Sequence, residues 1–180
     1  DLALVTGNLG KPSAGLYPLF TGTNEQGSKD VGCSPRYLPS YRPVSDAEAR
    51  ETVGQAWGAQ VPASEGTGVT GLAGAIREGR VTALQVMGDS PSLSGEDQTA
   101  FMAAAEQLDL LVVHGTFESE LTALADVVLP ASTFAETEGT FTNLERRVQL
   151  LRGALSPQGD EPAWRTITRI ATRMGAQGFE

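Results

Sequence analysis

Small and polar residues that could contact a ligand follow three short apolar runs, at 81–87, 110–113 and 126–129. Glycine lets a ligand approach the backbone closely, while Asp, Ser, Thr, His and Asn supply short hydrogen-bonding side chains. This combination suits a nucleotide-like ligand at the carboxyl edge of a parallel sheet, although the same pattern is common in α/β domains generally. The candidate contact residues are Gly88, Asp89, Ser90, His114, Gly115, Thr116, Glu138, Gly139, Thr142 and Asn143.

Other chemistry finds little support in the sequence. His114 is the single histidine, and a lone histidine after a buried strand is more often a hydrogen-bonded loop residue than a base. No Ser or Cys nucleophile accompanies it, so acyl transfer is not indicated. The single Cys33 excludes an internal disulfide and an all-protein thiolate metal site. We therefore expect no catalytic residue and no metal ligand in this chain.

A group of charged residues around 136–147 has two interpretations. Glu136, Glu138 and Glu145 could do acid–base chemistry, because paired carboxylates can hold and release protons. Arg146 and Arg147 stand beside them, and this neighbourhood favours a solvated ion-pair network instead.

The elements that would position the loops alternate along the chain. Each apolar run indicates a buried strand, and helical patterns fall between the runs, at 95–108 and 118–124. Strands alternating with helices predict right-handed crossovers and a small, mainly parallel sheet covered by helices on both faces, which is a three-layer α/β/α fold. We expect the three strands to be neighbours. The strand residues expected to be nearly fully buried are Leu110, Val112, Val127 and Leu129.

Further elements flank this sheet. Ser45 and Glu48 predict a capping box that starts a helix ending at Gly58. Other expected elements are a short helix at 72–78, a strand at 146–151 and a helix at 161–174. Trp164 should pack on the apolar side of this last helix against the body of the domain. Residues 1–44 lack periodicity apart from a short apolar start, which could be the last turns of a truncated helix. We therefore expect an irregular segment at 1–44 that follows a truncated helix, and one α/β domain at 45–180.

Size and charge narrow the class of protein. A chain of 180 residues can bury one sizeable core. Its net charge of −9 argues against nucleic acid as a partner, and no apolar run approaches the ~20 residues of a membrane span. The chain starts at Asp1 and ends just past a predicted helix, and we expect it to be a fragment of a longer polypeptide.

Four segments, in order, resemble the molybdopterin oxidoreductase family. Residues 4–12 (LVTGNLGKP) resemble its "LLTGNxGKPG", 24–32 (NEQGSKDVG) its "NNxQGxxDMG", and 87–91 (MGDSP) its "MGENP". The fourth and longest is 125–149, ADVVLPASTFAETEGTFTNLERRVQ. The resemblance implies the fold of the middle domains of formate dehydrogenase and dimethyl sulfoxide reductase. It also implies family cofactors, molybdopterin guanine dinucleotide and iron–sulfur clusters, with the nucleotide held partly at the loops described above.

Several positions depart from the formate dehydrogenase pattern. Phe20 and Gly22 stand where "PVRGQ" has the arginine and glutamine, and Gly115 stands where "QDxF" has the acidic residue. Asp89 and Ser90 replace the usual Glu-Asn or Glu-Asp. A phenyl ring cannot pair with a carboxylate substrate as a guanidinium does. These departures suggest a relative that kept the fold and lost the cofactor, with the candidate contacts vestigial.

Our first hypothesis is therefore a cofactor-free, structural part of the large iron–sulfur subunit of bacterial NADH–quinone oxidoreductase (respiratory complex I), serving electron transfer from NADH to quinone. The clusters would lie elsewhere in the parent chain. Its partners would be the rest of the subunit and other subunits of a respiratory complex, on the cytoplasmic side of the inner membrane without a span of its own. The alternative is a molybdopterin guanine dinucleotide-binding domain of a catalytic formate dehydrogenase-type oxidoreductase. The sequence leaves open whether the chain has enzymatic activity.

Overall fold

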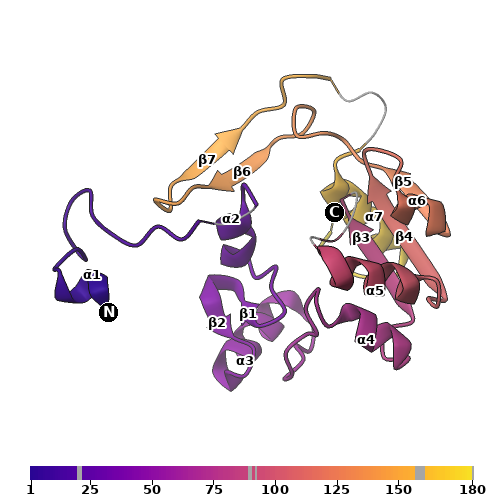
Figure 1. Cartoon of the computed structure of the whole chain (residues 1–180), viewed down its shortest axis with the longest axis horizontal. Helices are drawn as coiled ribbons and strands as arrows, with labels where there is room; N and C mark the ends of the chain where they lie inside the picture. Colours follow the sequence, from indigo (N-terminus) through magenta and orange to yellow (C-terminus); the bar gives the residue numbers. More distant parts are fainter. Residues whose placement is uncertain (20–21, 89–90, 92, 157–160, 180) are drawn as a thin grey trace. The chain divides into compact units, whose positions relative to one another are not determined.

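The computed structural model describes residues 1–19, 22–88, 91, 93–156 and 161–179. The chain forms two compact units. The hairpin unit comprises Asp1–Glu65 and Gly139–Leu151, and the sheet unit comprises Gly66–Glu138 and Arg152–Glu180 (Figure 1). The expected boundary between an irregular segment 1–44 and a domain 45–180 stays a prediction.

The sheet unit is built on three parallel strands. They are β3 (Ala83–Met87), β4 (Leu110–Gly115) and β5 (Val127–Pro130), in the order β3-β4-β5. In register, Val86 lies opposite Val113, and Val113 lies opposite Val128. The predicted strands are thus confirmed as parallel neighbours in one sheet, and the chain has an α/β fold.

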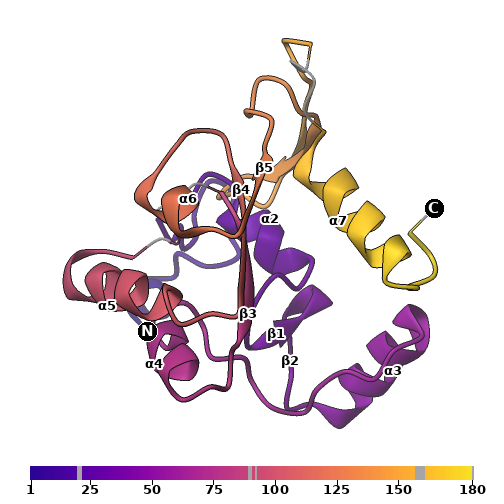
Figure 2. The ribbon, with the colours of Figure 1, turned by 90° about the vertical axis from the view of Figure 1, so that its right-hand side faces the viewer.

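Helices of the sheet unit lie on both sides of the sheet. They are α4 (Leu72–Arg77), α5 (Gly95–Ala105), α6 (Glu120–Leu124) and α7 (Ala163–Arg173). In Figure 2, α5 and α6 lie to one side of the sheet and α7 to the other. The core cluster joins α4, α5 and α6 to β3 and β4; its fully buried large side chains include Phe101, Leu111, Val113 and Leu121.

The expected burial of four strand residues was wrong. Leu110 is 43% exposed and Val127 is 41% exposed, while Val112 and Leu129 are half-buried. Residues of one parity share a sheet face, and Val112 pairs with Val127 in register. All four residues therefore lie on the face opposite Leu111 and Val113, which face the core. The face that α5 and α6 do not cover carries the expected residues.

The last helix also differs from expectation. Trp164 is 55% exposed, and α7 contributes no buried side chain in the described part of the chain. The prediction that Trp164 packs against the body of the domain is wrong. Its ring instead has the Arg165 guanidinium above it, 5.2 Å from the ring centroid.

The hairpin unit combines short helices with two small antiparallel sheets. Its elements are α1 (Leu2–Val5), α2 (Glu25–Asp30), β1 (Tyr37–Leu38), the 3-10 turn η1 (Pro39–Tyr41), β2 (Arg42–Pro43), α3 (Ala47–Trp57), β6 (Gly139–Thr142) and β7 (Val148–Leu151). β1 pairs with β2, and β6 pairs with β7. Leu38, Val44 and Ala49 form its small core, with Val53 and Val61 packed against them.

The start of α3 departs from the predicted capping box. Asp46, not Ser45, caps the helix, because its Oδ1 accepts a hydrogen bond from the Ala49 N–H at 3.1 Å. The Arg42 guanidinium donates to the same carboxylate, and this bond together with that from Ala49 holds the pKa of Asp46 below 3.8. Gly58 ends the helix in the left-handed conformation, as predicted.

Every helix in the described part of the chain is too short or too polar to cross a bilayer.

Candidate functional site

The carboxyl ends of the three parallel strands are level with one another. The Gly88 N–H donates to the His114 carbonyl at 2.9 Å, and the Ala131 N–H donates to the Gly115 carbonyl at 3.0 Å. Thr116 follows β4 directly. The structure therefore brings four of the candidate residues, Gly88, His114, Gly115 and Thr116, to one edge of the sheet. Whether they contact a ligand stays a prediction.

His114 lies in β4 itself, one residue before its end, with 1% of its surface exposed. Its Nε2 is 2.7 Å from Nε2 of Gln85 on β3, and burial lowers its pKa from the ordinary 6.5. In the described part of the structure, its Nδ1 is buried without a hydrogen-bond partner. If the Gln85 amide donates to Nε2, the proton of the neutral ring sits on Nδ1. A buried N–H without an acceptor is costly, so a ligand or water oxygen would stabilise it.

The remaining candidates lie in other parts of the chain or outside the described residues. Asp89 and Ser90 lie outside the described residues. Gly139 and Thr142 begin and end β6 of the hairpin unit, and Asn143 follows them. Residues 139–142 pair with β7 and form a hairpin, and whether these three candidates contact a ligand stays a prediction. Glu138 is the last residue of the sheet unit before it.

The charged residues at 136–147 make separate local contacts and do not form one ion-pair network. Glu136 Oε2 accepts from both the N–H and the hydroxyl of Thr133, each at 2.8 Å, and so closes a local turn. Glu145 forms an ion pair with Arg147 at 3.3 Å. The Arg146 guanidinium lies over the Tyr41 ring, 5.6 Å from its centroid. These contacts hold backbone and rings in place, which fits a structural role for the acidic residues.

The hairpin unit contains a cavity that the sequence did not reveal. Its volume is about 270 Å³, and its lining residues are Leu19, Gly22, Thr23, Glu25, Gln26, Thr142, Asn143 and Leu144. Two of the predicted candidates, Thr142 and Asn143, are among them, and within the hairpin unit they meet residues of the α2 region. Their partners lie more than 100 positions away in the sequence, so local patterns could not indicate the cavity.

A side chain at the start of α2 joins the two walls of this cavity. The Asn24 Nδ2 donates to the Thr140 carbonyl at 3.0 Å, and its Oδ1 accepts from the Thr142 N–H at 2.9 Å. The amide therefore binds the edge of β6 much as another strand would. Within the hairpin unit, this contact brings Thr142 and Asn143 beside α2.

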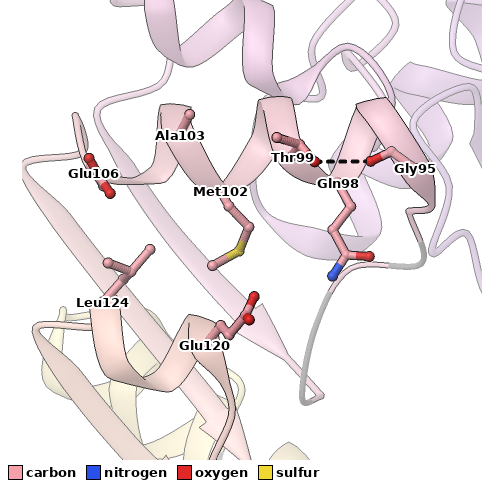
Figure 3. A pocket seen from close by; sticks show the side chains of 8 residues that line it. All are labelled: Gly95, Gln98, Thr99, Met102, Ala103, Glu106, Glu120 and Leu124. Carbon is pink, nitrogen blue, oxygen red and sulfur yellow. Dashed lines mark hydrogen bonds between the residues drawn. The ribbon is translucent and has the colours of Figure 1, made fainter.

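An open groove lies between α5 and α6 of the sheet unit. Its volume is about 530 Å³, and Met102 of α5 and Leu124 of α6 supply much of its apolar lining, with Glu106 and Glu120 nearby (Figure 3). Thr99 turns its hydroxyl back to the Gly95 carbonyl at 3.3 Å. The described residues bring together no group of three His, Cys, Asp or Glu side chains suited to a metal ion.

The parallel sheet with helices on both sides places the chain among α/β proteins, and comparison with known proteins identifies the family. The model of the molybdopterin oxidoreductase family matches residues 1–173. The chain therefore belongs to the molybdopterin oxidoreductase family, as the four sequence segments indicated.

Individual relatives narrow the comparison. The chain is 41% identical over 177 residues to the probable oxidoreductase YjgC of Bacillus subtilis, covering 98% of this chain and 18% of that protein. It is 38% identical to formate dehydrogenase H of Escherichia coli, covering 97% and 25%. It is 39% identical to F420-dependent formate dehydrogenase 2 subunit alpha of Methanococcus maripaludis, covering 98% and 26%. The chain thus spans about a fifth to a quarter of the length of these relatives.

These relatives support the alternative hypothesis better than the first. They are formate dehydrogenases and an oxidoreductase, rather than iron–sulfur subunits of NADH–quinone oxidoreductase. The family is one of molybdopterin oxidoreductases, and that coarser part of the prediction is confirmed.

Proposed function

We propose that this chain is part of a formate dehydrogenase-type molybdopterin oxidoreductase and that its sheet edge holds part of a molybdopterin guanine dinucleotide. The observation that carries the proposal is the buried, unpartnered Nδ1 of His114 at the level carboxyl ends of three parallel strands, within the described part of the structure. Ligands of open α/β sheets bind outside such strand ends. The family assignment supplies the chemical identity of the ligand.

The residues present fit a nucleotide at this edge. Gly88 has a φ of 106°, and a Cβ placed there would meet no atom of the described residues within 4 Å, so this part of the backbone is open to close approach. His114 Nδ1 offers a hydrogen-bonding atom for a carbonyl or phosphate oxygen, and Thr116 follows it in the chain. When bound, the cofactor supplies the redox chemistry. The role of this chain's residues is to bind and orient its nucleotide part.

The second candidate is the cofactor-free part of the large iron–sulfur subunit of NADH–quinone oxidoreductase. The specific observation in its favour is the set of departures at Phe20, Gly22 and Gly115, of which Phe20 lies outside the described residues. In either case we propose further subunits as partners, because the methanococcal relative is named as a subunit alpha. A peripheral position at the inner membrane, through such a complex, remains part of the second candidate.

The first test is metal and nucleotide content. The complete gene product, purified from a molybdenum-replete host, should contain about one molybdenum or tungsten per chain and should release guanine nucleotide on acid treatment. Iron with neither metal and no guanine nucleotide would overturn the proposal and favour the second candidate.

A matched pair of variants tests the sheet edge itself. Gly88→Ala adds a Cβ at the proposed site, whereas Gly79→Ala adds one at the end of α4. Both glycines have positive φ, 106° and 69°, and open space among the described residues around the new Cβ. Alanine is more strained at Gly88, because 106° lies outside the small left-handed region that other residues can adopt, so nucleotide content is compared per folded protein. We expect Gly88→Ala to lose most of its bound nucleotide and Gly79→Ala to retain it. Equal retention in both variants would contradict the placement at this edge.

A further inference from the structure

We propose that the open groove between α5 and α6 of the sheet unit is a docking site for a basic, amphipathic helix of another protein. The groove is lined by residues at 95–106 and 120–124, and none of the candidate ligand contacts is among them. The proposal therefore does not rest on the proposed function. It depends on the apolar floor of the groove, on the spacing of its side chains and on its charge.

The floor of the groove is apolar and comes from both helices. Met102 of α5 is half-buried and packs against the core cluster, while Leu124 of α6 is 36% exposed. Figure 3 shows Met102 pointing from α5 toward α6 and Leu124 pointing from α6 toward α5. A methionine side chain is flexible and adapts to the surface of a partner. Such a floor between two helices is suited to the apolar face of a third helix.

The spacing of the lining residues matches a helix as well. Gln98, Met102 and Glu106 are four residues apart and share one face of α5, over about 12 Å. Glu120 and Leu124 are also four residues apart, on α6. The groove has a volume of about 530 Å³ but is open along its length. A pocket for a small molecule encloses most of its ligand, so a polypeptide segment fits this shape better.

The rim of the groove is acidic. Glu106 and Glu120 are both exposed, and neither forms an ion pair with any residue that the structure describes. Glu106 directly follows the last turn of α5, where the helix dipole disfavours a negative charge. An arginine or lysine from a partner would offset this repulsion at Glu106 and pair with Glu120. The apolar floor with its acidic rim therefore complements a helix that is apolar on one face and basic beside it.

The surrounding sequence extends the negative charge. Between residues 81 and 138 of the sheet unit the chain has no Lys or Arg, and ten of its 22 acidic residues lie there. The two arginines just before this stretch are already engaged. Arg77 donates to the Ala100 carbonyl at 3.0 Å, and Arg80 is paired with Glu78 at 2.7 Å. An excess of one charge attracts partners of the opposite charge and repels the others, so this stretch selects a basic partner.

The chain's own basic helix is a poorer occupant. α7 contains three arginines, but it lies on the other side of the sheet from α5 and α6 (Figure 2) and does not cover the groove of its own chain. In a second copy, two of these arginines are already engaged. Arg169 is paired with Glu161 at 3.0 Å, and Arg165 lies over the Trp164 ring. A helix of another protein, with its basic side chains free, fits the groove better.

A pair of synthetic peptides of equal charge tests the groove. The first is a helical peptide of about 15 residues with leucines along one face and arginines beside them, and the second has the same composition in scrambled order. Each is labelled and titrated with the complete gene product by fluorescence anisotropy. We expect the amphipathic peptide to bind saturably, one per chain, and at least about tenfold more tightly than the scrambled peptide.

Two double variants of equal charge assign the binding to this groove. Glu106→Gln/Glu120→Gln removes both carboxylates of the rim, and we expect affinity for the amphipathic peptide to fall about fivefold. Glu96→Gln/Asp97→Asn is the matched control, because these residues lie in the first turn of α5 and do not line the groove. It should change the affinity less than about twofold.

A further variant tests the apolar floor. Leu124→Gln places a polar side chain on the floor without changing the charge, and we expect affinity for the amphipathic peptide to fall about tenfold. Melting temperatures confirm that each variant is folded. If Leu124→Gln does not fold, the two double variants still decide the outcome, since they alter exposed side chains alone.

The proposal is wrong if the amphipathic peptide shows no saturable binding or binds no more tightly than the scrambled one. It is also wrong if the control pair loses as much affinity as the groove pair. A complete gene product that sediments as a dimer, and becomes a monomer in the groove pair, would assign the groove to a second copy instead. Metal and nucleotide content is measured on the same preparations, so failure here is distinct from failure of the proposed function.

Discussion

Replacement of Asn24 by alanine should loosen the β6–β7 hairpin. The Asn24 side chain joins α2 to a strand whose bonded residues lie 116 and 118 positions further along the chain. Alanine removes the donor to the Thr140 carbonyl and the acceptor for the Thr142 N–H together. The hairpin then keeps its β7 partner but loses its attachment to α2.

The magnitude follows from the two hydrogen bonds and their exposure. A typical intramolecular hydrogen bond contributes ~0.5–1.5 kcal/mol, so two contribute about 1–3 kcal/mol. Asn24 is half-buried, and water can reach part of the vacated site, which places the expected loss in the lower half of that range. Asn24→Asp keeps the acceptor for Thr142 but sets a carboxylate oxygen against the Thr140 carbonyl. We expect it to lose at least as much stability as alanine.

Hydrogen exchange measures the effect where it occurs. The Thr142 amide should exchange roughly 5- to 15-fold faster in Asn24→Ala, which corresponds to about 1–1.6 kcal/mol of lost protection. Amides of β4 in the sheet unit should be unaffected. Asn8→Ala is the matched control, because it removes an exposed asparagine bond in the hairpin unit that is remote in sequence from β6.

Two outcomes would refute this reasoning. Unchanged protection at Thr142 in Asn24→Ala would show that β7 alone holds β6 in place. Equal loss in Asn8→Ala would show that the effect is a general loosening rather than the loss of this attachment.

Two further predictions concern the sheet unit. Val113→Ala should cost about 2–3 kcal/mol in denaturant unfolding because Val113 is fully buried, whereas Val127→Ala should cost under about 1 kcal/mol because Val127 lies on the exposed face; equal costs would contradict the observed packing. Burial lowers the pKa of His114 below 6.5 in the folded protein, so below pH 6.5 the unfolded state binds more protons than the folded state. The contribution of His114 to stability is therefore full above pH 6.5 and is lost as the pH falls toward the folded pKa. The loss is about 1.4 kcal/mol for each pH unit by which the folded and unfolded pKa differ. Unfolding at pH 5 and pH 7.5 should show that decline in the unmodified protein and a smaller one in His114→Gln; identical declines would refute the assignment to His114.

The parallel sheet could be predicted because its signal is local. Each strand is a short apolar run, each crossover is helical, and handedness rules leave few ways to join them. The signal that decides which face of the sheet is buried is not local in the sequence. Leu110 and Leu111 are chemically identical in sequence, and the helices α5 and α6 pack on the face of Leu111. The alternation of side chains along a strand predicts that a sheet has two faces, but the packing of the helices determines which face is covered.

The caps and the cavity illustrate two other limits. Ser45 and Asp46 are both good helix caps, and the structure selects Asp46, whose carboxylate also accepts from Arg42. Gln26 belongs to a recognisable motif, yet its place in a cavity depends on Thr142 and Asn143 across more than 100 residues. A pattern of neighbouring residues contains no information about such a contact.

The segment 125–151 contributes elements to both units, and hydrogen bonds order the turn that follows β5. It supplies β5, then the turn closed by Glu136 and Thr133, and then the β6–β7 hairpin. The returning chain is held against this turn, because the N–H groups of Ala154 and Leu155 both donate to the Ala135 carbonyl, at 2.7 and 2.9 Å. Gly153 permits that approach, since a Cβ there would come within 3.3 Å of the Glu136 carbonyl oxygen. The chain therefore leaves and re-enters the sheet unit at one fixed point, while Asn24 fixes the hairpin within its own unit.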